Sequence, residues 1–145
     1  MIRIVVRGTP APQGSKSFKG MSKAGRAILT ESSKKVRPWR QDVMAAAEAL
    51  RERTGAAPID GPVLVSMVFT LQKPASAPKR RRTYPMRTPD LSKLARSTED
   101  ALTDAGIWAD DARVIGYTKL WKTYPMEDVD ALDTPGAVIE IREVV

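Results

Sequence analysis

The sequence predicts an α/β (α+β) fold: a mixed β-sheet of about four to five strands and two main helices in a single domain, residues 1–145. Short β-branched runs alternate with two segments of helical periodicity, which is the pattern of mixed α/β folds. A length of 145 residues is enough for one core, and 42% hydrophobic residues without internal repeats indicate a globular protein.

The first half of the chain predicts two strands, a loop and a helix. Residues 1–6 (MIRIVV) and 26–30 read as strands, and residues 9–25, rich in Pro, Gly, Ser and Lys, read as a loop between them. In that loop QGSK (13–16) either contacts a phosphate through backbone N–H groups and Lys16 or is a plain basic surface loop; P-loop spacing is absent. A helix is expected from near Arg37 to Gly55, with Trp39 in the core.

The second half predicts one central strand, one helix and two closing strands. Residues 62–71 (PVLVSMVFTL) are the most apolar stretch and are expected in the middle of the sheet. Residues 72–88 hold six basic residues and no acid, which predicts an exposed loop. A helix is expected from Leu91 to Ala105, stopped by Gly106, followed by strands at 112–121 and 137–145 with an acidic turn region, 127–133, between them.

Composition limits the chemistry. Net charge is +7, and up to Arg40 ten basic residues face one acid, which predicts a polyanionic partner, although basic runs are also common in solvated loops. There is no Cys and no His, so any metal must be held by oxygen ligands, which favours Mg²⁺, with Mn²⁺ possible. The chain carries no signal-peptide pattern and no long apolar run, so a soluble, cytoplasmic protein is expected.

Concentrated acid in this basic chain lies around the second predicted helix. Asp90 precedes the helix, Asp110 and Asp111 follow it, and Lys93 and Arg96 lie on its polar face. An antiparallel return after Gly106 would carry the later acids back beside the helix. Together these residues predict a metal site that acts on phosphate. Taken singly, Asp90 also suits a plain N-cap, Arg96 an exposed ion pair with Asp100, and Asp110-Asp111 a turn.

The stretch PDLSKLARSTEDALTDAGIWADDARV, preceded by PAPQGSK and SSKKVRPWRQDV, resembles the RusA family of Holliday-junction resolvases. The resemblance implies a member of the phage or prophage type. The resemblance covers nearly the whole chain. It implies a homodimer of mixed α/β subunits that binds a four-way DNA junction and cuts opposed strands with Mg²⁺, in DNA recombination and repair in a bacterial or phage-infected cell.

The resemblance also assigns residues. The family's D-x-D motif, later DD pair and lysine fall on Asp90, Ser92, Asp110-Asp111 and Arg96, so the second Asp and the lysine are replaced. Asp90 and Asp111, with Asp110 beside them, are the expected Mg²⁺ ligands, because one or two carboxylates suffice. Ser92 supplies only a hydroxyl, and Glu99, two turns along, is a distant acidic substitute.

Metal-assisted phosphodiester hydrolysis is the favoured mechanism, with Arg96 and Lys93 stabilising the transition-state charge. The competing interpretation is a non-catalytic protein that binds branched or duplex DNA, its metal site weakened by Ser92. An RNA-binding protein is disfavoured because the chain has three Trp, three Tyr and two Phe and no evident stacking platform. DNA contacts are expected from Lys16, Lys79, Arg80, Arg81, Arg82 and Lys93.

Overall fold

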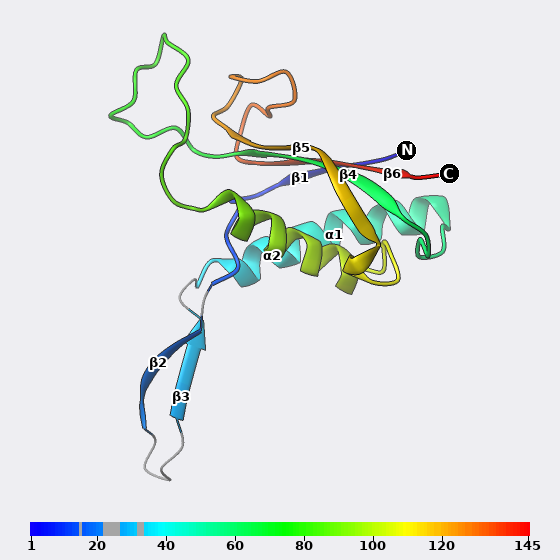
Figure 1. The fold of residues 1–145 in the computed structure, drawn as a ribbon. Coiled ribbons are helices and arrows are strands. Elements are labelled where there is room, and N and C mark those ends of the chain that lie inside the picture. The colour runs from blue at the N-terminus through cyan, green and yellow to red at the C-terminus, as the bar shows by residue number, and fades with distance from the viewer. Residues whose placement is uncertain (15, 22–26, 32–33) are drawn as a thin grey trace.

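The computed structural model describes residues 1–14, 16–21, 27–31 and 34–145, with side chains for 1–14 and 34–145. No helix in these described ranges is long and apolar enough to cross a membrane. The elements, drawn in Figure 1, are β1 (Ile2–Arg7), β2 (Lys16–Met21), β3 (Ala27–Glu31), α1 (Val36–Thr54), β4 (Val63–Thr70), α2 (Leu91–Asp104), the 3₁₀ turn η1 (Asp111–Arg113), β5 (Val114–Thr123) and β6 (Gly136–Glu143).

Four strands form one mixed sheet in the order β1-β6-β4-β5. β6 pairs antiparallel with β1 and β4, whereas β4 and β5 run parallel. A parallel pair cannot be joined by a tight turn, and here α2 provides the crossover. The predicted mixed sheet with two helices and a central strand near 62–71 is confirmed.

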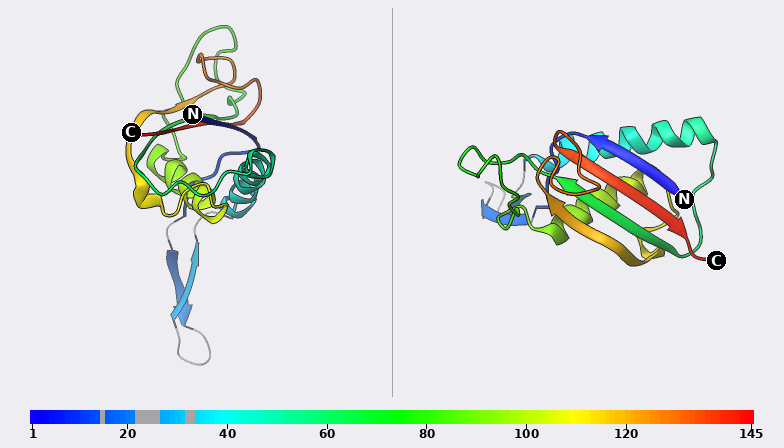
Figure 2. Two further views of the ribbon diagram at one scale, coloured as in Figure 1. Left: turned by 90° about the vertical axis from the view of Figure 1, so that its right-hand side faces the viewer. Right: turned by 90° about the horizontal axis from the view of Figure 1, so that it is seen from above.

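Both helices cover the same face of the sheet, as Figures 1 and 2 show. Alternate residues of β4 point at the helices, so a strand with period two meets helices with period 3.6. Trp39 from α1 and Leu94 from α2 are 1% and 0% exposed, which confirms the predicted core position of Trp39. The buried residues that β4 contributes to this core are Val63, Val65, Met67 and Phe69.

The predicted loop at 9–25 is wrong in part, because β2 lies inside it and pairs with β3 as a separate two-stranded hairpin. Composition favoured a loop, but pairing to residues 27–31 supplies the hydrogen bonds that such a segment cannot find within itself. Figure 1 shows this hairpin extending away from the helices. The strand predicted from Ala112 begins instead at Val114, after η1.

The α1–α2 contact contains a buried polar pair. The indole Nε1 of Trp39 donates to Thr98 Oγ1 at 3.1 Å, and that hydroxyl donates to Leu94 O at 2.8 Å. Thr98 is 0% exposed, so no solvent can replace the contact. A buried donor left without a partner costs about 1–3 kcal/mol.

Replacing Thr98 by Val keeps the shape and removes the acceptor. We expect Thr98→Val to lower the free energy of unfolding by about 1–3 kcal/mol, measured by denaturant titration. In a Trp39→Phe background no indole N–H remains to be stranded, so the same substitution should cost clearly less. Equal losses in both backgrounds would show that the hydrogen bond does not carry the effect.

Candidate active site on helix α2

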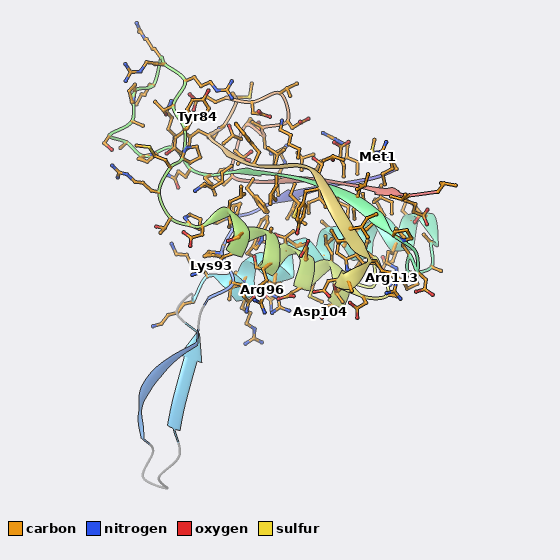
Figure 3. All side chains as sticks on the ribbon, viewed as in Figure 1. Met1, Tyr84, Lys93, Arg96, Asp104 and Arg113 are labelled. Carbon is orange, nitrogen blue, oxygen red and sulfur yellow. The ribbon has the colours of Figure 1, made fainter. Side chains whose placement is uncertain are left out.

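Helix α2 separates an apolar face from a charged one. Six of its residues are buried, among them Ser97, whose hydroxyl donates to Ala11 O at 2.7 Å. Ser92, Lys93 and Arg96 are exposed, as predicted from helical spacing. Figure 3 shows Lys93 and Arg96 toward the N-terminal half of the helix, and Asp104 at its far end near Arg113.

Asp90 occupies the N-cap position of α2, yet its side chain makes no capping hydrogen bond. Its carboxylate is exposed, with Lys93 Nζ 3.9 Å away. The segment leading to it is fixed from β5, where Lys122 Nζ donates to Arg87 O at 2.8 Å and to Pro89 O at 3.1 Å. The Asp90 side chain therefore does not cap the helix, and its carboxylate oxygens are available to a cation.

Lys122 belongs to this end of the site and was missed by the sequence analysis. It lies in β5, and nothing in the sequence distinguishes it from Lys119 in the same strand. Only the parallel register, which sets Lys122 beside Phe69, brings it to the start of α2. No local pattern could have distinguished it.

Asp110 and Asp111 form a hydrogen-bonded pair of carboxyl groups at the start of η1. Asp110 Oδ1 accepts from the Ala112 amide at 2.7 Å, and this bond, followed by one shared with Asp111, holds the pKa of Asp110 below its usual value. The same shared bond raises the pKa of Asp111. The two adjacent carboxyl groups thus disfavour each other's ionised form, and a bound divalent cation would offset this repulsion.

Glu99 and Tyr117 complete this acidic end. The Tyr117 hydroxyl donates to Glu99 Oε1. Burial is the main reason that the pKa of Glu99 is raised, and the charges of Asp111 and Asp100 add to the effect. Burial, followed by the hydrogen bond to Glu99, also raises the pKa of Tyr117. From the sequence, Glu99 was expected only as a distant acidic substitute, and Tyr117 was not expected at the site.

The structure therefore divides the predicted acids between two places. Asp110 and Asp111 lie together, facing Glu99 and Asp100, as the predicted return of the chain required. Asp90 lies at the other end of α2; nine residues of helical rise, about 13 Å, separate it from Glu99. Among the described residues, no three Asp or Glu side chains converge as a ready metal cage.

The donor chemistry nevertheless fits a hard cation. Mg²⁺ is commonly held by one or two carboxylates, with waters and substrate oxygens completing its six positions. The exposed Asp110-Asp111 pair offers two such carboxylates with an electrostatic reason to bind a divalent charge. A cation here would need no histidine or cysteine.

The predicted DNA contacts lie on different elements. Lys79, Arg80, Arg81 and Arg82 are exposed on the loop between β4 and α2, and Arg82 lies over the Tyr84 ring at 5.0 Å from its centroid. Within the described part of the chain, the Arg96 side chain makes no ion pair or hydrogen bond, so its guanidinium is free to bind an anion. The side chain of Lys16 falls outside the described residues.

No curated protein matches the chain. The family model Endodeoxyribonuclease RusA matches residues 8–142, which is nearly the whole sequence and includes both helices, β4 and β5, whereas β1 lies before the matched range. The chain therefore belongs to the RusA family of endodeoxyribonucleases.

Proposed function

We propose that this protein resolves four-way (Holliday) DNA junctions by symmetric, Mg²⁺-dependent phosphodiester hydrolysis, with Mn²⁺ as an alternative ion, in DNA recombination and repair. The family match over residues 8–142 carries this proposal. The exposed acids that flank α2 and the cations on it support the proposal, because phosphodiester hydrolysis needs both a metal-binding carboxylate and a site for phosphate charge. Two cuts related by symmetry favour a homodimer. The proposed setting is the cytoplasm of a bacterial or phage-infected cell.

Asp90, Asp110 and Asp111 are the proposed metal ligands. Because Asp90 lies at the opposite end of α2 from the Asp110-Asp111 pair, the two places would each hold their own ion. A bound divalent ion would supply Lewis acidity toward the scissile phosphate. Arg96 would hold a phosphate oxygen pair through its planar guanidinium, and Lys93 would add a second positive charge one turn away. Ser92, exposed beside them, would orient a water by hydrogen bonding.

The second candidate function is DNA binding without cleavage. It is favoured by one observation, namely that no three acidic side chains converge in the described residues, with Ser92 where the family pattern has an acid. Such a protein would bind branched or duplex DNA through its basic loop and α2, and its affinity would fall steeply with salt.

Cleavage of an immobile four-way junction, compared with linear duplex, separates the two functions. With Mg²⁺ we expect paired nicks on opposed strands, abolished by chelator. Asp111→Asn and Asp90→Asn should each lower the rate at least about 100-fold, because a metal contributes several kcal/mol and about 1.4 kcal/mol is tenfold.

Asp104→Asn is the matched control. Asp104 is also an exposed acid of α2, but it pairs with Arg40 at 2.7 Å and has no role in the proposed chemistry. Its variant should cut at the wild-type rate. Junction binding by the wild type without any cleavage would establish the binding protein instead, and absence of junction preference would refute the resolvase.

Ser92→Asp tests what the missing carboxylate does. Adding an acid two residues after Asp90 should raise the cleavage rate at limiting Mg²⁺ and lower the Mg²⁺ concentration for half-maximal rate, since a charged oxygen ligand strengthens binding of a hard cation. Ser92→Asn has nearly the same shape without charge and should give no gain. Equal rates for both variants would mean that position 92 does not face the ion.

A further inference from the structure

The basic loop, residues 72–88, has a composition that opposes a fixed conformation. Its six cations repel one another, no acid lies within it, and it contains no helix or strand. Figure 1 shows this segment beside the loop that follows β5, and Figure 2 agrees. The contacts between the two loops therefore decide how the cations are presented.

Glu127, from the second loop, holds the basic loop at two points. Its Oε1 accepts from Lys73 Nζ at 3.0 Å and from the Thr83 amide at 3.1 Å. The Lys73 and Glu127 side chains are only 18% and 14% exposed, so solvent screens the pair weakly. One carboxylate oxygen thus joins the start of the loop to the residue directly after Arg82.

Glu127, Lys73 and the Thr83 amide form a clamp on the basic loop, and Lys73 makes further contacts within it. Its Nζ also donates to Arg81 O at 3.1 Å and lies 5.8 Å from the centroid of the Tyr124 ring. The ammonium is therefore occupied by the protein itself. A cation engaged in this way fixes the backbone between Arg81 and Thr83 and is not available to a ligand.

Asp128 braces the neighbouring turn. It accepts from Lys119 Nζ and from the Asp130 amide, both at 2.9 Å, and lies 4.0 Å from Arg82 Nη2. Burial alone would raise the pKa of Asp128, but the Asp130 amide and Lys119 together hold it below its usual value. These bonds favour the ionised form of the Asp128 carboxyl beside Arg82.

These contacts leave the remaining cations free around a hollow of about 590 Å³, lined by the run 79–82 together with Lys73 and residues 125–129. Lys79 and Arg80 are exposed, and within the described part of the chain neither makes an ion pair or hydrogen bond. Glu127 Oε2 is buried without a partner among the described residues, which is a poor arrangement for stability alone. The clamp therefore makes more sense as a device that fixes geometry.

We propose that Glu127 is a positioning residue that, by clamping Lys73 and the Thr83 amide, presents Lys79, Arg80 and Arg81 as a preformed contact surface for the phosphate backbone of junction DNA. The proposal rests on the proposed function. Preorganisation matters because an unclamped basic loop must be ordered at the moment of binding, which weakens affinity. The expected effect on DNA binding is opposite to that of charge alone, because removing the acidic Glu127 from beside a DNA-binding surface should weaken binding.

The test compares Glu127→Ala with Asp130→Ala. Both remove one negative charge from the same loop, but only Glu127 contacts the basic loop. Electrostatics alone predicts tighter DNA binding for both. We expect Asp130→Ala to bind the junction as well as or better than wild type, and Glu127→Ala to bind more weakly. The slope of log K against log salt should be about one to two units shallower for Glu127→Ala, because each lost phosphate contact removes about 0.9.

A DNA-free measurement accompanies this one. Limited trypsin digestion, followed by mass spectrometry of cleavage after residues 79–82, should be faster in Glu127→Ala than in wild type or Asp130→Ala, because local opening admits the protease. If Glu127→Ala does not fold, Lys73→Met removes the other half of the clamp and should show the same faster cleavage. Unfolding midpoints establish that every compared variant is folded.

The outcomes are distinct. The positioning role would be overturned if trypsin cut Glu127→Ala after residues 79–82 no faster than it cuts Asp130→Ala. A slope of log K against log salt equal to that of wild type would also overturn it. Tighter junction binding by Glu127→Ala, matching Asp130→Ala, would overturn it as well. Failure of the wild type to bind any junction would refute the proposed function instead, while the trypsin comparison would still decide whether Glu127 clamps the loop.

Discussion

The parallel pairing of β4 with β5 is the constraint on which the rest of the structure depends. Strands that run the same way cannot be joined by a hairpin, so the chain must cross the sheet between them, and α2 makes that crossing. The residue before the helix and the residues after it are consequently held a helix length apart. Asp90 and the Asp110-Asp111 pair owe their positions to this connection, and the exposed face between them owes its accessibility to the burial of Leu94 and Leu102.

The acids of this basic protein act in two ways. At the C-terminal end of α2, Asp110 and Asp111 share a hydrogen bond that lowers the pKa of Asp110 and raises that of Asp111, and the charge of Asp111 adds to the effect of burial in raising the pKa of Glu99. Two adjacent carboxyl groups of this kind favour a divalent cation. In the loop after β5, Glu127 and Asp128 are instead matched with lysines at 2.9–3.0 Å. The carboxylates at the end of α2 are therefore available to a ligand, whereas Glu127 and Asp128 are already paired with the protein's own cations.

The two basic regions differ in the same physical sense. Arg96 projects from a rigid helix whose buried face is locked by Trp39 and Thr98, so its position is set by packing. The run 79–82 has no packed face and is placed by a few partly buried polar contacts. A four-way junction presents phosphates in several directions, and a protein that binds it benefits from cations on more than one element. The arrangement of α2 and the basic loop meets that requirement.

Local patterns in the sequence were sufficient to determine the mixed α/β class, both helices, the central strand, the exposed charged face of α2 and the basic character of residues 72–88, because each depends on periodicity or composition within a short window. The β2–β3 hairpin escaped prediction because its hydrogen bonds are made to a partner strand, which composition does not reveal. Tertiary structure alone decided that Asp111 faces Glu99 rather than Asp90, that Lys122 reaches the start of α2, and that Glu127 holds the basic loop. These contacts join residues far apart in the chain, and their geometry follows from strand register and helix length, which no local pattern encodes.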